Sequence, residues 1–230
     1  LEGMAADSPA TRALQSHCAA QARPLRIIAG HERALLQSDL SPETYWHTHV
    51  RAQKRKEIRR LINRLEELGT VTHHRLATDA TQTDVSAWID DFLALERSGW
   101  KGREGTALDS IPQTRAFFRA ALTQAHAAGI LDMLRIDLNA TPLAMLVNFR
   151  LGSGAYSYKI AFDERYARYS PGILIEIDNL QAALSDPTLD WTDSCAAPNH
   201  PMIDGIWAER RRIVQFRVGL RGSGLTGLRR

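Results

Sequence analysis

The stretch YSYKIAFDERYARYSPGILIEIDN, residues 156–179, decides the fold class of this chain. In its first part, aromatic and branched side chains alternate with smaller or polar ones, and this period of two predicts a strand over residues 156–162. Ser170 then stands at the position of a helix N-cap and Pro171 at the first helical position, so a helix is expected to begin at Ser170. A strand, a polar connection and a helix in this order indicate mixed α and β structure.

The first turn of that helix has the composition of an anion site. Its amides lack intrahelical partners, Gly172 lets a ligand approach the backbone, and Arg168 adds a positive charge. A phosphate or pyrophosphate fits this chemistry. The alternative is that Ser-Pro simply begins a helix after a strand, and this motif alone does not decide between the two.

The rest of the chain alternates between helical and strand patterns. The segments expected to be helical begin at Ser41 or cover residues 51–68, 84–98, 112–128 and 201–207. The segments expected to be strands are residues 26–28, 33–36, 71–77, 131–138, 142–149, 189–195 and 211–218. Residues 100–106 are expected to be a flexible, Gly-punctuated loop. Strands on both sides of a central helix predict an α/β (α+β) fold with a mixed sheet.

The two ends of the chain differ in character from its middle. Leu1, Glu2 and Gly3 ahead of Met4 resemble an expression remnant, and residues 4–24 are expected to be a mobile arm or a loosely docked helix. Residues 25–218 are expected to form one domain, and residues 219–230 a basic, Gly-rich tail that is disordered or engaged with a partner. No apolar run is long enough to span a membrane and no secretory signal is visible, which predicts a cytoplasmic protein.

Positive charge is concentrated in two places. Residues 51–64 carry seven arginines and lysines on the outer face of a predicted helix, and the chain after Glu209 contains arginines but no acid. A solvated helix face is one interpretation, and an acidic substrate, RNA or a membrane surface is the other. The abundance of alanine and arginine fits a bacterial proteome.

Metal binding is not expected. Cys18 and Cys195 are far apart and are expected to be free thiols. The pairs His47/His49 and His73/His74 lack the spacing of metal ligands on a helix and have no nearby cysteine.

Four segments carry a resemblance to a known family. They are KRKEIRRLINRLEELG at residues 54–69, LERSGWKGREGTA at 95–107, FFRAAL at 117–122 and YSYKIAFDERYARYSPGILI at 156–175. Over residues 40–218 the chain resembles the GNAT superfamily of N-acetyltransferases. Within it, the chain is most similar to the cellulose-biosynthesis-associated acetyltransferase-like proteins, which are related to the Fem peptidyltransferases. The resemblance implies an acyl-coenzyme A N-acyltransferase fold with a mixed, mostly antiparallel sheet flanked by helices.

The resemblance also implies a place for the acyl donor, acetyl-coenzyme A. In the superfamily, the strand before the signature loop binds the pantetheine arm, which here implicates Ile160, Ala161, Phe162 and Asp163. The loop and helix start bind the pyrophosphate, which implicates Arg168, Tyr169, Ser170, Gly172 and Ile173. This chain departs from the superfamily pattern at Pro171, which removes one amide donor.

Direct acyl transfer to an amine or hydroxyl needs an acid and a base. Tyr158 is expected to protonate the departing thiolate, and Glu96, Asp193 and His200 are candidate bases, although each also fits a structural or exposed role. Trp100, Lys101 and Lys159 are expected to border the acceptor. By the pleat of a strand, Tyr158 and Lys159 point to opposite faces unless a bulge intervenes.

Three functions remain open at this point. The first is a coenzyme A-dependent acyltransferase that acts on a small molecule, a sugar amine, an amino acid or a polysaccharide precursor. The second is a Fem-like transferase that uses aminoacyl-tRNA, bound through the basic helix 51–64 and the C-terminal tail. The third is a non-catalytic subunit of an envelope-polysaccharide assembly.

Overall fold

One sheet organises the computed structural model, which describes residues 1–220. Within these residues its strands are β1 (Met4–Ala5), β2 (Leu25–Leu36), β3 (Val71–Arg75), β4 (Leu131–Leu138), β5 (Thr141–Leu151), β6 (Gly154–Phe162), β7 (Trp191–Asp193) and β8 (Glu209–Val218). Their order is β1-β8-β2-β7-β6-β5-β4-β3, and β6 and β7 are the parallel pair in an otherwise antiparallel sheet. The predicted mixed, mostly antiparallel sheet is confirmed.

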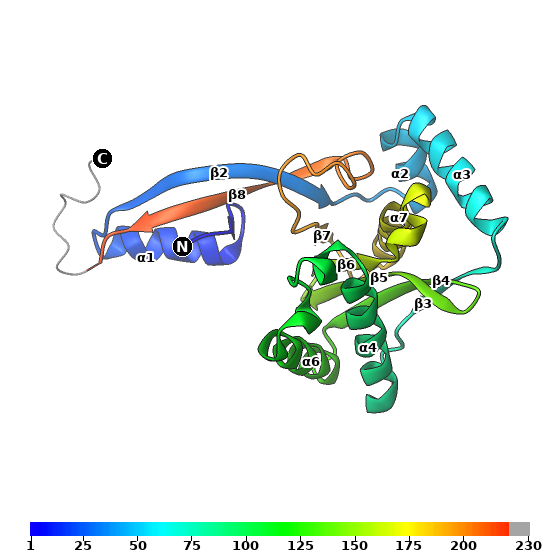
Figure 1. Ribbon diagram of the computed structural model, residues 1–230. Coiled ribbons are helices and arrows are strands. Elements are labelled where there is room, and N and C mark those ends of the chain that lie inside the picture. The colour runs from blue at the N-terminus through cyan, green and yellow to red at the C-terminus, as the bar shows by residue number, and fades with distance from the viewer. Residues whose placement is uncertain (221–230) are drawn as a thin grey trace.

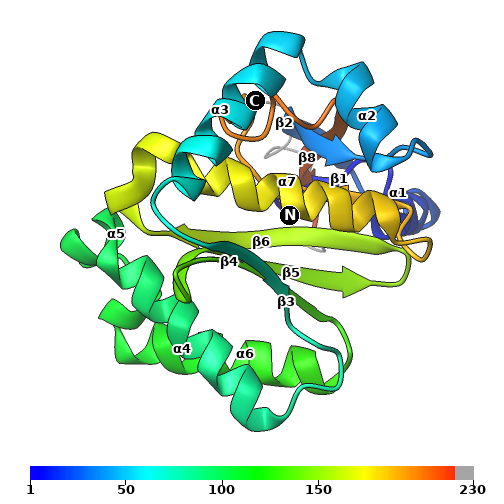
Figure 2. The same cartoon turned by 90° about the vertical axis from the view of Figure 1, so that its right-hand side faces the viewer.

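Helices cover both faces of the sheet. The α-helices are α1 (Pro9–Ala20), α2 (Pro42–His49), α3 (Ala52–Glu66), α4 (Gln82–Ser98), α5 (Trp100–Arg103), α6 (Pro112–Ala127) and α7 (Pro171–Ser185), and the 3-10 helices are η1 (Leu108–Ser110) and η2 (Glu164–Tyr169). In Figure 2, α7 and α3 lie on one side of β3–β6, and α4 and α6 lie on the other. The helices expected at 84–98 and 112–128 match α4 and α6 closely.

Alternation along the central strands divides the core in two. On β4 and β5, Leu134, Ile136 and Leu146 pack with α7, α2 and α3. Met133 and Met145, on the opposite face, pack with α4 and α6. Each such side chain contributes about 1.5–3 kcal/mol when it is fully buried, so both layers hold the sheet in place.

A long ribbon of β2 and β8 projects from the rest of the chain, with β1 and α1 beside it (Figure 1). The two short strands expected at 26–28 and 33–36 are one strand, because pairing with β8 runs from Leu25 to Leu35 with a bulge near Ile27. In the segment expected to be an arm or a docked helix, α1 is capped by Ser8, and Thr11 and Cys18 are buried. Most of the expected basic tail, residues 221–230, lies outside the described residues.

Three local expectations were wrong. Residues 100–103 form the helix α5 rather than a flexible loop, because the Glu164 carboxylate accepts the Trp100 amide at 2.7 Å and caps the turn from a distant part of the chain. The strand expected at 189–195 is limited to β7. Residues 201–206 form successive turns instead of a helix, and Gly205 lies within them, where it lowers helix propensity.

Candidate active site

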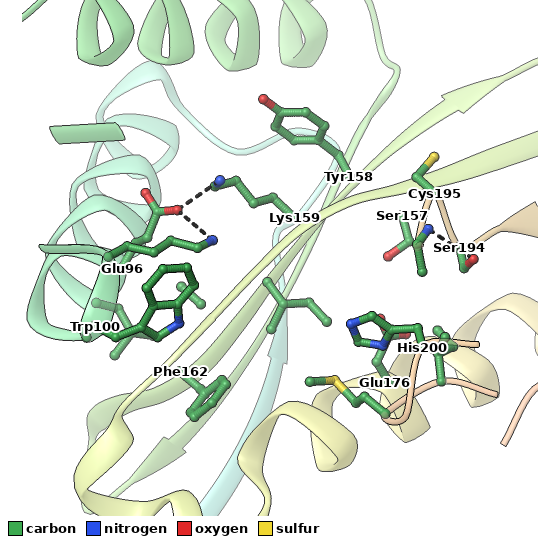
Figure 3. Close-up of a pocket in the computed structure, with 18 of the residues that line it drawn as sticks. Glu96, Trp100, Ser157, Tyr158, Lys159, Phe162, Glu176, Ser194, Cys195 and His200 are labelled. Atoms are coloured by element: carbon green, nitrogen blue, oxygen red, sulfur yellow. Dashed lines mark hydrogen bonds and ion pairs between the residues drawn. The ribbon is translucent and has the colours of Figure 1, made fainter. Parts of the chain in front are cut away.

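A cavity opens where two neighbouring strands separate. β6 and β7 pair only from Gly154↔Trp191 to Tyr156↔Asp193, after which the chain following β7 leaves the sheet. Between β6 and that segment lies a cavity of about 340 Å³, to which α4, α5 and α7 also contribute side chains (Figure 3). The parallel pair therefore leaves the second half of β6 with one free edge.

The backbone of that free edge faces the cavity at alternate residues. The Asp163 amide donates to the Leu143 carbonyl on β5 at 2.9 Å, and the same register pairs Ala161 with Met145. Because hydrogen-bonded and outward-facing residues alternate in an antiparallel ladder, the amides of Ile160 and Phe162 point toward the cavity. The amides of Ala161 and Asp163 are directed to β5. The Asp163 carboxylate binds Arg165, so neither the backbone amide nor the carboxylate of Asp163 is available to bind an acyl donor.

A β-bulge reorients the strand that was expected to alternate regularly. Val147 pairs with Lys159 and Asn148 with Ser157, so Tyr158 is the extra residue of the bulge. Tyr158 packs against Phe118 and Phe149 at ring distances of 6.5 and 5.4 Å, on the side of α6. Tyr158 and Lys159 therefore project to the same side of the sheet, because the bulge removes the opposite orientation expected of a regular strand. In Figure 3 the Tyr158 hydroxyl points away from His200 and Glu176.

Glu96, on α4, organises the positive charges of the cavity. Its carboxylate lies 2.9 Å from Lys159 Nζ and 3.2 Å from Lys101 Nζ, and it accepts the Leu108 amide at 2.9 Å. Burial acts to raise the pKa of Glu96, but the Leu108 amide and the two lysines outweigh it and the pKa is lowered. Glu96 therefore stays ionised at neutral pH and serves as a counter-ion, which is a poor state for a general base.

Glu176, on α7, is the acid that the sequence analysis missed. Its side chain lines the cavity, yet the residue is only 3% exposed. Burial raises the pKa of Glu176 to about 7, against the lowering effects of hydrogen bonds from Asn179 and Ser157. A carboxyl group with a near-neutral pKa is suited to proton transfer. Its signal in the sequence is an acid between Ile175 and Ile177, inside an apolar run.

The remaining acid–base candidates separate clearly. His200 lines the cavity, and its Nδ1 atom is buried without a hydrogen-bond partner in the described part of the chain. Asp193 does not line the cavity: it is fully buried and binds Arg33 at 2.6 Å and Arg211 at 3.4 Å. Asp193 is thus a structural anion, and its assignment as a base was wrong.

Cys195 also borders the cavity without being a suitable nucleophile. Cys195 is exposed as a residue, but desolvation of its thiol, together with the nearby Asp193 carboxylate, raises the pKa of the thiol to about 11. Little thiolate is therefore present at neutral pH.

The first turn of α7 offers few hydrogen-bond donors. Ser170 is at the N-cap position but adopts φ 55° and makes no side-chain cap, while the amides of Ile173 and Leu174 donate to its carbonyl at 2.9 and 3.2 Å. Since Pro171 has no N–H, Gly172 carries the one first-turn amide that lacks an acceptor among the described residues. A Cβ on Gly172 would lie 2.9 Å from the Met202 methyl group, so the chain after β7 covers this turn.

Fit to coenzyme A is thus uneven along the molecule. The strand edge at Ile160 and Phe162 has the donors that a pantetheine arm needs. At the helix start the Gly172 amide is buried beneath Met202, and the cation present is Arg168, whose guanidinium stacks on the Tyr169 ring at 4.8 Å. Of the residues expected at the site, the following line the cavity: Glu96, Trp100, Lys101, Tyr158, Lys159, Ile160, Ala161, Phe162 and His200. Asp163, Arg168, Tyr169, Ser170, Gly172, Ile173 and Asp193 do not.

Two further features of the described residues are negative. No cluster of three or more histidine, cysteine, aspartate or glutamate side chains in residues 1–220 is arranged to hold a metal ion. In the same residues, none of the helices has the length and apolarity needed to cross a membrane.

A family match covers the part of the chain that forms most of the cavity. The model of the acetyltransferase (GNAT) domain family matches residues 52–197, which include α3 to β7 and all walls of the cavity except the segment 198–203. Comparison with curated protein sequences finds no significant match.

Solved structures share the fold at low sequence identity. The crystal structure of FemX has a TM-score of 0.61 and 9% identity, and the match covers 92% of this chain and 70% of that one. The C-terminal domain of a putative lysylphosphatidylglycerol synthetase from Agrobacterium fabrum has a TM-score of 0.56 and 13% identity, with 99% and 69% covered. L-PGS from Bacillus licheniformis has a TM-score of 0.53 and 10% identity, with 94% and 68% covered.

Proposed function

Since the chain belongs to the GNAT acetyltransferase family, we propose that it transfers an acyl group from a coenzyme A thioester to an amine, or to a hydroxyl, of an acceptor bound in the cavity. The observation that carries this proposal is the position of Glu176. A buried carboxyl group with a pKa of about 7 lines the same cavity as the free edge of β6. An acyl transfer needs these two elements together, namely oxyanion donors and a base.

The residues of the chain divide the reaction between them. Coenzyme A supplies an activated acyl thioester. The amides of Ile160 and Phe162 bind the donor along the strand edge and stabilise negative charge on the thioester oxygen. Glu176 takes the proton from the amine as its nitrogen attacks the carbonyl carbon. His200 donates a proton to the sulfur as the carbon–sulfur bond breaks.

Acceptor binding is assigned to the opposite wall. Trp100, whose side chain is 51% exposed, stands at the mouth of the cavity beside Lys101 and Lys159. An aromatic surface next to fixed charges suits a polar small molecule such as a sugar amine, an amino acid or a polysaccharide precursor.

A second donor class is favoured by one observation. Among the described residues, the first turn of α7 keeps only the Gly172 amide without an acceptor, and Met202 covers it, while α3 exposes Arg59, Arg60 and Arg64 at its surface. A Fem-like transferase that takes its acyl group from aminoacyl-tRNA has less need of a pyrophosphate site and more need of a basic face. A non-catalytic subunit of an envelope-polysaccharide assembly has no use for Glu176, whose burial is costly to stability.

The test compares donors of different length. Calorimetric titration with acetyl-coenzyme A and with acetyl-pantetheine, which lacks the nucleotide, measures how much each half of the site contributes. We expect both to bind, with less than about a hundredfold between their dissociation constants, a difference of under about 2.7 kcal/mol. Ile160→Pro removes a cavity-facing N–H group and keeps the hydrogen bonds between β6 and β5. It is therefore expected to weaken the binding of both ligands.

Binding of neither ligand, together with salt-sensitive binding of tRNA, would overturn the coenzyme A assignment and support the second donor class. Absence of all three interactions would support the non-catalytic subunit.

A further inference from the structure

A chain of polar side chains crosses the buried layer between α7 and the sheet and ends at Glu176. Asn179 Nδ2 donates to Glu176 Oε2 at 3.1 Å, and Asn148 Nδ2 donates to Asn179 Oδ1 at 2.8 Å. Asn148 Nδ2 also donates to Asp132 Oδ2 at 3.1 Å, and Asp132 Oδ1 accepts from Arg75 Nε at 2.6 Å. The four inner residues are each at most 7% exposed, whereas the Arg75 side chain is 40% exposed at the β3 edge.

From Asn148 onward the donors point toward Glu176, and Asp132 sets that direction because it accepts from Asn148 on the other side. A carboxylate paired with a guanidinium can only accept, so Asn148 must turn its NH₂ group toward Asp132. The same NH₂ group then meets the carbonyl oxygen of Asn179, which leaves the Asn179 NH₂ group facing Glu176. The Asn148 Oδ1 atom is buried without a hydrogen-bond partner in residues 1–220, so the orientation of this amide is held against its own hydrogen-bonding needs.

We propose that Asp132 and Asn148 are positioning residues for the base: they orient Asn179 so that an N–H donor always meets the Glu176 carboxyl group. The proposal rests on Glu176 being the base of the proposed acyl transfer. A donor at this position favours the ionised carboxyl group and so opposes the effect of burial. Asp132, on β4, thereby controls a group on α7 through two amides.

Other polar and titratable side chains lie around Glu176. Ser157 on β6 hydrogen-bonds to it, and His200, from the segment after β7, lines the same cavity. The remaining titratable groups that line the cavity are Glu96, Lys101, Tyr158, Lys159, Glu164 and Cys195. None of these belongs to the chain of amides, so a change at Asp132 reaches Glu176 through Asn148 and Asn179.

The experiment measures the ionisation of Glu176 without any substrate. In protein labelled with ¹³C at glutamate carboxyl carbons, the Glu176 signal is identified by its loss in Glu176→Gln and is titrated with pH. In Asp132→Asn the side chain at position 132 can donate as well as accept, so the amides lose their fixed direction. We expect the pKa of Glu176 to rise by about one unit, which corresponds to loss of one hydrogen bond to a charged group.

Asp137→Asn is the matched control, because Asp137 is also buried on β4 but binds Arg135 instead of the chain of amides. It is expected to leave the titration of Glu176 unchanged. Asn148→Leu interrupts the chain at its centre and is the second variant if Asp132→Asn does not fold. An unchanged titration in a folded Asp132→Asn or Asn148→Leu protein, or an equal shift in Asp137→Asn, would overturn the proposal.

The same variants separate this proposal from the proposed function. If neither acetyl-coenzyme A nor acetyl-pantetheine binds but the Glu176 titration shifts in Asp132→Asn, the positioning role is supported and the proposed acyl transfer is rejected. If activity is present, the acid limb of kcat/KM is expected to move with the Glu176 titration, so that Asp132→Asn loses about fivefold of its rate at pH 7.

Discussion

Lys159 Nζ on β6 lies 2.9 Å from Glu96 Oε1 on α4, and the Glu96 side chain is only 3% exposed. This ion pair joins the free edge of the sheet to the helix that forms the opposite wall of the cavity. The bulge at Tyr158 makes the pair possible, because it determines the side of the sheet to which Lys159 projects.

Glu96→Gln is expected to lower the free energy of unfolding by about 2 kcal/mol, because two lysines lose their counter-ion while the buried amide of Leu108 keeps an acceptor. Chemical denaturation at pH 7 measures the difference. Glu104→Gln, at an exposed position after α5, is the control and is expected to change stability by less than about 0.5 kcal/mol. Equal stability of the two variants would show that the lysines do not depend on Glu96.

The Glu176 carboxyl group makes stability depend on pH. Its pKa is about 7 in the folded chain and near 4.5 in an unfolded one, so between these values the folded state binds more protons. The stability it contributes is fully present below about pH 4.5 and is lost as pH rises through 7. Wild type is expected to lose about 3 kcal/mol relative to Glu176→Gln over this interval, measured by urea denaturation of both proteins at each pH. A constant difference between them would mean that Glu176 is ionised throughout.

His200 and Tyr158 are expected to differ in their effect on turnover. His200→Gln removes a cavity-facing proton donor and is expected to lower kcat by about a hundredfold or more in an acyl-transfer assay. Tyr158→Phe is the matched comparison, and little change is expected because the hydroxyl group points away from Glu176 and His200. A large loss in Tyr158→Phe with no loss in His200→Gln would restore tyrosine as the acid.

Cys195 is expected to take no covalent part in the reaction. With a thiol pKa of about 11, roughly one molecule in ten thousand carries the thiolate at pH 7. Cys195→Ala is therefore expected to retain activity, and mass spectrometry of the protein incubated with donor alone is expected to show no acylated cysteine. An acyl adduct at Cys195 would indicate a two-step mechanism instead of direct transfer.

Much of the fold could be predicted because its signals are local. The cap at Ser41, and the alternation over the hairpin of β4 and β5, depend on residues close together in the chain. The failures occurred where a distant contact overrode the local pattern. Glu164 converts an expected loop into α5, and β8 holds β2 as one strand.

The site was predicted only in part, because its position follows from local sequence segments but the state of each acid depends on distant contacts. The resemblance in residues 95–107 and 156–175 pointed to two walls of the cavity, and Glu96 and Lys159 do lie there, while His200 lines the cavity from the segment after β7. The roles of individual acids could not be read from the pattern. Asp193 and Glu176 are both buried, but two arginines surround the first and amide and hydroxyl groups surround the second.

The sequence by itself determined the helices α4 and α6, the strand before the α7 turn and the loss of an amide at Pro171, since these depend on neighbours in the chain. Tertiary structure alone decided which side of the sheet Tyr158 faces, where β6 becomes a free edge, and which carboxyl group has a near-neutral pKa. The reason is physical: a register shift and the desolvation of a charge are both produced by elements far apart in sequence.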